Sequence, residues 1–180
     1  GNPIMGETLS AEASFIGADF TSSTFEWYRG HERLSVTGPS YLTTADDVGL
    51  EIFLSVTPVG PSGEHGPSTR AQSTGPIAVA GDIKSTIGEW VNLGMRRFDG
   101  CMEGDKERML LMQTDKLKIR DKKTGKTILK DSYAAIRMEL GKDPMGFTLT
   151  MGGGTSKKGG GSLTLHAPNS IVRNLIALAL

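Results

Sequence analysis

The sequence predicts a mainly β protein made of two domains, and three observations support this. Apolar residues alternate with polar ones along short segments, which is the period-2 pattern of half-buried strands. Helical spacing is found at the end of the chain, in residues 168–180. Residues 1–83 carry a net charge of −7 and residues 84–180 a net charge of +7, so the overall charge is zero. This asymmetry predicts two units with different surfaces.

The composition is that of a folded protein in a reducing compartment. Of the 180 residues, 37% are hydrophobic and 22% charged, which excludes a disordered chain. The single cysteine, Cys101, excludes an intrachain disulfide framework and a cysteine-built zinc site. No secretory signal is recognisable, and the longest apolar run, Leu175–Leu180, is too short to span a bilayer. The missing initiator Met favours a piece of a longer protein.

Residues 1–82 are expected to form an immunoglobulin-like β-sandwich. Short strands separated by Gly/Pro-rich turns, without helical periodicity, are typical of that fold. We expect Trp27 to fill the space between the two sheets, and Asp47-x-Gly49 to turn the chain into the next strand. The expected strands are Leu9–Phe15, Thr24–Arg29, Tyr41–Thr43, Leu50–Thr57 and Thr69–Thr74, with a loop at Gly60–Pro67.

Residues 83–180 are expected to form a pleckstrin-homology-like β-barrel capped by a C-terminal α-helix. Seven short strands followed by one amphipathic helix is the element order of that fold. The strands are expected at 89–95, 109–112, 116–120, 127–129, 135–140, 146–151 and 162–165. In the helix, Pro168 suits the first turn, and one apolar stripe is expected to close the barrel: Ile171, Val172, Leu175, Ile176 and Ala179.

The sequence offers no catalytic, cofactor-binding or metal-binding residues. The three histidines, His31, His65 and His166, lack metal-ligand spacing. Asp99 and Glu103 flank Cys101 and are expected to raise its pKa, which argues against a reactive thiolate. The glycine-rich stretch 151–161 lacks the residue order of a phosphate-binding loop and is interpreted as a flexible connection between strands. We therefore predict that the chain is not an enzyme.

A basic cluster is the candidate binding site. It consists of outward-facing strand residues, residues of the adjoining turn and one residue beyond it: Lys116, Lys118, Arg120, Lys122, Lys123, Lys126 and Lys130. Such a cluster is either an ordinary solvated face or a surface that recognises a phosphoinositide, an acidic protein or a polymer such as the microtubule. The loop Asp99–Arg108, where lipid-binding relatives of the fold collect cations, is net acidic. Nucleic acid is not expected, because no aromatics interleave the cations.

The first domain also carries a combination of motifs found in a known repeat. These motifs are Gly6-Glu7-Thr8-Leu9, Phe25-Glu26-Trp27-Tyr28-Arg29-Gly30, Tyr41-Leu42-Thr43-x-x-Asp46-Asp47-Val48-Gly49, Val56-Thr57-Pro58-Val59 and Gly63-x-x-Gly66. Together they resemble an immunoglobulin-like repeat of the large microtubule-associated protein family of plants and protists that was first described as auxin-induced in root cultures. Residues 84–180 resemble, by layout, the region after the last repeat of that family. The resemblance is therefore expected to cover nearly the whole chain.

The resemblance implies the tail of a cytoskeletal adaptor, located in the cytoplasm with the cytoskeleton. It does not imply direct microtubule binding, because the basic N-terminus and leucine-rich repeats of the family are not in this sequence. We expect a non-catalytic protein-interaction and localisation module with cytoskeletal protein partners. The alternative is a peripheral membrane module that binds phosphoinositides through the same basic face.

Overall fold

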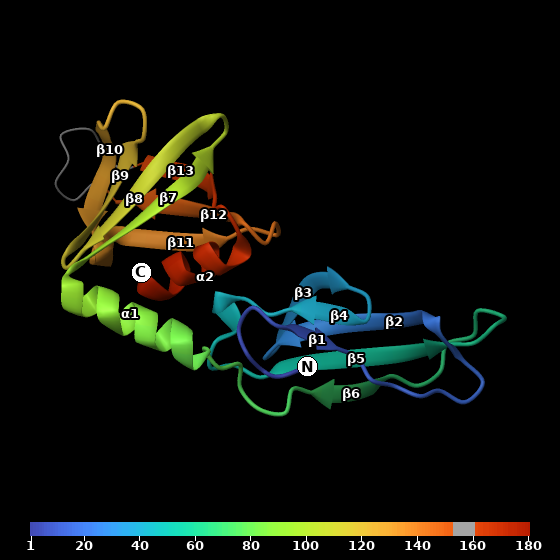
Figure 1. The fold of residues 1–180 in the computed structure, drawn as a ribbon. Coiled ribbons are helices and arrows are strands. Elements are labelled where there is room, and N and C mark those ends of the chain that lie inside the picture. The colour runs from blue at the N-terminus through green and yellow to red at the C-terminus, as the bar shows by residue number, and fades with distance from the viewer. Residues whose placement is uncertain (153–160) are drawn as a thin grey trace. The chain divides into compact units, whose positions relative to one another are not determined.

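The computed structural model describes residues 1–152 and 161–180, which divide into two compact units, Gly1–Ala80 and Gly81–Leu180. Both units consist mainly of antiparallel strands, and a helix ends the second, so the predicted fold class is confirmed (Figure 1). The expected glycine-rich connection lies largely outside the described residues. Each unit is described below by itself.

Unit 1 consists of a four-stranded and a two-stranded antiparallel sheet (Figure 1). The larger sheet has the order β3-β2-β5-β6, and the smaller one pairs β1 with β4. The elements are β1 (Thr8–Ser10), β2 (Asp19–Arg29), β3 (Glu32–Thr37), β4 (Ser40–Leu42), the 3₁₀-helix Ala45–Asp47, β5 (Ile52–Val59) and β6 (Thr69–Gln72).

Two strand predictions in unit 1 need correction. The strand expected over Leu9–Phe15 ends at Ser10, because its partner β4 has only three residues with which to pair. The strand β3 was not predicted at all. It is an edge strand, and its side chains are exposed apart from the half-buried Leu34, so its sequence shows no apolar alternation.

The core of unit 1 is built around Trp27, as predicted. The indole is buried, packs against the ring of Tyr41 with the centroids 5.7 Å apart, and donates a hydrogen bond from Nε1 to the carbonyl of Gly38 at 2.9 Å. Leu54, which lies opposite Trp27 on β5, and Val56 are buried in the same unit. Trp27 is therefore a core residue whose only polar group is satisfied within the chain.

A buried carboxylate fixes the turn that leads into β5. Asp47 is fully buried, and its oxygens accept hydrogen bonds from Arg29 Nε at 2.8 Å, the Tyr41 hydroxyl at 2.7 Å and the Thr44 amide at 2.6 Å. Burial, and then the bond to Asp47, raise the pKa of Tyr41. Gly49 follows with a φ of +81°, a conformation that side chains other than glycine rarely adopt. The expected turn at Asp47-x-Gly49 is confirmed.

Unit 2 is a seven-stranded antiparallel sheet with one helix before it and one after it (Figure 1). The strand order is β10-β9-β8-β7-β13-β12-β11. The elements are α1 (Gly81–Leu93), β7 (Met95–Glu103), β8 (Lys106–Gln113), β9 (Lys116–Asp121), β10 (Thr127–Ser132), the 3₁₀-helix Tyr133–Ala135, β11 (Ile136–Leu140), β12 (Gly146–Met151), β13 (Gly161–His166) and α2 (Ser170–Ala179).

The predicted closed barrel is not found. Within the described residues, no strand pairing joins the edge strands β10 and β11, so the sheet remains open. A single 3₁₀ turn, Tyr133–Ala135, connects these two strands, which lie at opposite ends of the sheet. Side chains from the strands and both helices fill the interior, including Phe98, Leu110, Phe147 and Ile176.

The first strand of unit 2 was predicted in the wrong place. Residues 89–93 complete α1, because Ile87 and Trp90, three positions apart, lie on the helix face that packs against the core. Gly94, with a φ of +66°, ends the helix. The strand therefore begins at Met95 and includes Asp99–Glu103, so the expected loop Asp99–Arg108 is reduced to a turn at Gly104–Asp105.

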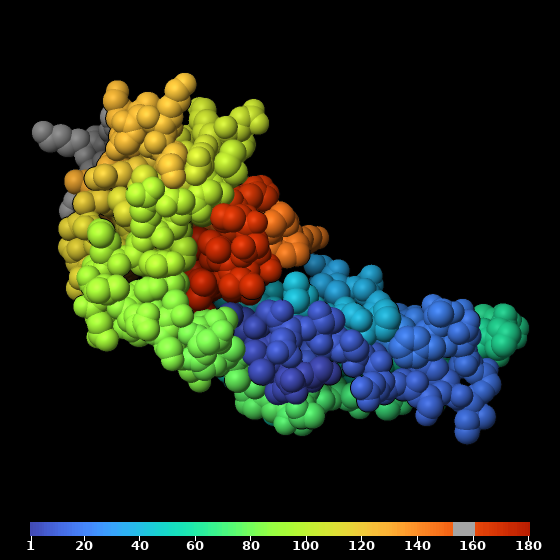
Figure 2. All heavy atoms as spheres, viewed as in Figure 1, coloured from blue at the N-terminus to red at the C-terminus, as the bar shows by residue number. Residues whose placement is uncertain are grey.

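The helix α2 contributes to the core, as predicted, but the apolar stripe that packs there is narrower than the predicted stripe of five residues. Ile176 is fully buried, and Val172, Leu175 and Ala179 pack against the core, whereas Ile171 is 59% exposed. Pro168 precedes the helix instead of forming its first turn, and Asn169 caps it by accepting a bond from the Val172 amide at 2.9 Å. Figure 2 shows this helix (red) at the surface beside the yellow-green atoms of the early part of the unit.

We predict that Asp47→Asn destabilises unit 1 by about 3 kcal/mol, because it leaves Arg29 without its buried partner and places an amide N–H₂ among donors. In hydrogen exchange followed by mass spectrometry, the amides of β2 and β5 should then exchange about a hundredfold faster. The matched control is Asp46→Asn, because the half-exposed Asp46 reaches Arg29 only at 3.9 Å. Equal exchange in the two variants would contradict the structural role of Asp47.

Candidate functional site: a basic sheet face

The candidate site is built on the alternation of β9. Leu117 and Ile119 are fully buried in the core of unit 2, so Lys116, Lys118 and Arg120 lie on the opposite, outer face of the sheet. All three outward residues are half-buried. The prediction that the three cations of this strand point outward is confirmed.

The strand register adds residues from both neighbouring strands to this face. Lys118 lies opposite Lys130 of β10 on one side and opposite Leu111 of β8 on the other. Arg120 lies opposite Met109 of β8. We define the basic sheet face as Lys116, Lys118, Arg120 and Lys130 together with Met109 and Leu111. It combines cations with an apolar strip, and this strip was not predicted from the sequence.

The opposed lysines and Arg120 are the charges of this face without an ion-pair partner among the described residues. Lys116 donates a hydrogen bond to Asp115 at 3.0 Å and thereby lowers the pKa of that carboxyl. The positive charge of Lys118 lowers the pKa of Asp115 further. Neither Lys118 nor Lys130 has a carboxylate within 4.0 Å in the described parts of the chain, and residues 153–160 contain no Asp or Glu. Like charges directly opposite on two strands destabilise a sheet.

The turn residues of the predicted cluster form a separate group. Asp121 organises the turn by accepting bonds from the amide and hydroxyl of Thr124 at 2.7 and 2.8 Å. Lys122 is neutralised, because its ammonium lies 2.7 Å from Asp99 and 3.6 Å from Glu107. Lys123 and Lys126 are exposed. The seven predicted residues therefore divide into four on the sheet face and three at the turn.

Three acidic residues near the β7–β8 turn, Asp99, Glu103 and Glu107, are paired with cations of the chain itself. The buried Arg108 bonds Glu103 at 2.7 Å and also pairs with Asp121. Hydrogen bonds from Arg97 and Lys122 lower the pKa of Asp99. A hollow of about 360 Å³ beside these groups is lined equally by acids and lysines: Asp105, Lys106, Glu107, Asp121, Lys122 and Lys123. Such a mixed lining gives no net attraction for a phosphorylated headgroup.

Cys101 is placed as a core residue. It is fully buried, and burial, followed by the charges of Asp99 and Glu107, raises the pKa of its thiol to about 11. The predicted rise is confirmed, although burial and not the neighbouring acids is the main cause. Of the histidines, His166 lies 3.2 Å from Asp143 at the surface. Across residues 1–152 and 161–180, no three His, Cys, Asp or Glu side chains are grouped as metal ligands.

Comparison with known proteins gives one partial similarity. No family model matches the chain. The 187-kDa microtubule-associated protein AIR9 of Arabidopsis thaliana is 34% identical over 84 residues, which cover 43% of this chain and 5% of that protein. The resemblance expected from the motifs is thus supported over less than half of the chain. Within the described residues, no helix is long and apolar enough to cross a bilayer.

We predict that Lys130→Glu stabilises unit 2, because it converts the repulsion with Lys118 into attraction. The expected gain is about 0.5 kcal/mol, so that amides of β9 and β10 exchange roughly twofold more slowly. Lys130→Gln removes the repulsion without adding attraction and should give a smaller gain. Faster exchange in both variants would contradict the unfavourable pairing of the two lysines.

Proposed function

We propose that the chain is a non-catalytic protein-interaction and localisation module of a cytoskeleton-associated protein, and that the basic sheet face is its binding surface. The observation that carries this proposal is the pair Lys118 and Lys130, two lysines directly opposite each other in the register of β9 and β10 and without a carboxylate partner among the described residues. A chain folding alone gains nothing from this arrangement. A bound carboxylate between the two groups would turn the repulsion into attraction.

The fold details are part of the same proposal. We interpret unit 1 as an immunoglobulin-like repeat, on the support of its two antiparallel sheets and the buried Trp27. We interpret unit 2 as a pleckstrin-homology-like domain, on the support of its seven antiparallel strands and terminal helix. The similarity to a microtubule-associated protein supports a cytoplasmic, cytoskeletal setting with cytoskeletal protein partners.

The face favours an acidic protein surface over a phosphoinositide. Met109 and Leu111 lie beside the cations on β8, so a partner that meets Lys118 and Arg120 also contacts apolar side chains. Protein interfaces combine such apolar contacts with charge complementarity. A phosphoinositide headgroup would meet the cations of the face but make no use of its apolar strip. The hollow at the turns offers no second headgroup site, because its three lysines share the lining with three acids.

The double variant Lys118→Glu/Lys130→Glu tests the proposal. It keeps two like charges opposed, so the fold should be retained, while the face changes sign. In quantitative affinity purification with the full chain as bait, capture of cytoskeletal proteins should fall about tenfold or more. The matched control Lys84→Glu/Lys142→Glu makes the same change in net charge at exposed positions away from the face and should leave capture unchanged.

Equal capture by the wild type and the double variant would contradict the proposal. Co-sedimentation with phosphatidylcholine vesicles that contain phosphatidylinositol 4,5-bisphosphate tests the membrane alternative. Vesicle binding that is lost in Lys118→Glu/Lys130→Glu, without any loss of protein capture, would replace the proposal by that alternative.

A further inference from the structure

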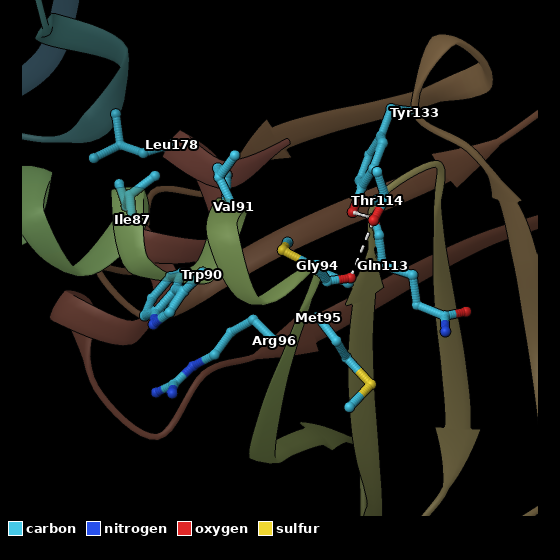
Figure 3. A pocket seen from close by; sticks show the side chains of 12 residues that line it. Ile87, Trp90, Val91, Gly94, Met95, Arg96, Gln113, Thr114, Tyr133 and Leu178 are labelled. Atoms are coloured by element: carbon cyan, nitrogen blue, oxygen red, sulfur yellow. Dashed lines mark hydrogen bonds between the residues drawn. The ribbon is translucent and has the colours of Figure 1, made fainter.

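A second candidate site lies in unit 2 at the end of both helices. It is an open pocket of about 240 Å³ bordered by the last turns of α1 and α2, the start of β7, the end of β8 and Tyr133 (Figure 3). None of its lining residues belongs to the basic sheet face, and the proposed function makes no use of it.

The pocket is lined mainly by apolar side chains, and its hydroxyl groups are already bonded. Ile87, Trp90 and Val91 come from α1, and Leu178 from α2. The Tyr133 hydroxyl donates to the Gln113 carbonyl at 2.6 Å, and the Thr114 hydroxyl donates to the Gly94 carbonyl at 3.3 Å. Gln113 also lines the pocket, and its Oε1 is buried without a hydrogen-bond partner among the described residues. The lining therefore suits a mainly apolar group.

The rim of the pocket exposes large apolar side chains to solvent. Val91 is 73% exposed and Met95 55%, and the adjacent Leu93 is 77% exposed. Val91 and Met95 both line the pocket, so their exposed side chains form an apolar patch at its mouth, whereas Leu93, two positions after Val91 on α1, points to another side of the helix. Patches of this kind mark interaction surfaces.

A guanidinium without a carboxylate partner lies at the same rim. The Arg96 guanidinium stacks over Trp90 at 4.4 Å from the ring centroid and lies 5.7 Å from that of Phe98. No carboxylate lies within 4.0 Å of it among the described residues. The two aromatic rings hold this cation in place beside the pocket, where it can meet an anion.

We propose that this pocket binds one large apolar side chain of an acidic peptide segment, whose carboxylate pairs with Arg96. The size of the pocket supports a side chain as the occupant, since pockets that enclose whole drug-sized ligands measure about 300–1,000 Å³. The charge of Arg96 selects an acidic segment over a neutral or basic one. Insertion of one anchoring side chain into a pocket ringed by apolar residues is the arrangement of an interface hot spot.

The test uses N-acetyl-phenylalanine, which carries an aromatic side chain and a carboxylate, and its neutral amide as the matched probe. Added to the full chain, the acid should shift the amide resonances of Val91, Gly94 and Thr114 with a dissociation constant on the order of 1 mM. The neutral amide should bind about threefold more weakly, because it lacks the charge that meets Arg96.

Two exposed positions on α1 provide the variants. Val91→Glu puts a charge at the mouth of the pocket and should abolish the shifts, whereas Asn92→Glu adds the same charge to the same helix outside the pocket lining and should retain them. Arg96→Gln should bind the acid and the amide equally. Shifts that persist in Val91→Glu would overturn the proposal. So would an acid that binds the wild type no better than the amide does, or the absence of shifts at an acid concentration about 10-fold above the expected dissociation constant.

Discussion

The candidate site depends on one constraint, the burial of Leu117 and Ile119 on the inner face of β9. Because these two side chains are fixed in the core, the residues that alternate with them along the strand must face outward. These residues are Lys116, Lys118 and Arg120. A register shift of one residue would bury the cations, so the core itself holds the charges at the surface. The pairing with β10 then brings Lys130 opposite Lys118. The burial of Leu117 and Ile119 thus also places two like charges opposite each other, and a cost in stability of this kind is common at functional surfaces.

Unit 1 is organised around one buried carboxylate, that of Asp47. Arg29, Tyr41 and Asp47 belong to separate pieces of the motif in the sequence, yet they meet at one buried carboxylate. The unit needs all three, because removal of any one leaves a polar group unsatisfied. These three residues therefore maintain the fold of the unit.

The sequence predicted those elements in which apolar alternation and burial coincide. β9 and β12 follow this rule, since their inward residues Leu117, Ile119, Phe147 and Leu149 are buried. The sequence did not predict α1, because the β-rich stretch after Glu89 obscured the helical spacing of Ile83, Ile87 and Trp90. It also did not predict the exposed strand β3. Contacts that depend on register could not be predicted. The opposition of Lys118 and Lys130, the pairing of Lys122 with Asp99, and the Arg96 pocket all join residues that only the folded sheet brings together.

Zero-length carbodiimide cross-linking, which joins a lysine amine directly to a carboxylate, is the most direct test of the central claim that the basic sheet face contacts acidic protein partners. Applied to the full chain bound to cytoskeletal proteins and analysed by mass spectrometry, it should link Lys118 and Lys130 to Asp or Glu residues of a partner. Unit 1 contains no lysine, so every such link reports on unit 2. Links confined to lysines away from the face, such as Lys84, Lys106 and Lys142, would contradict the claim.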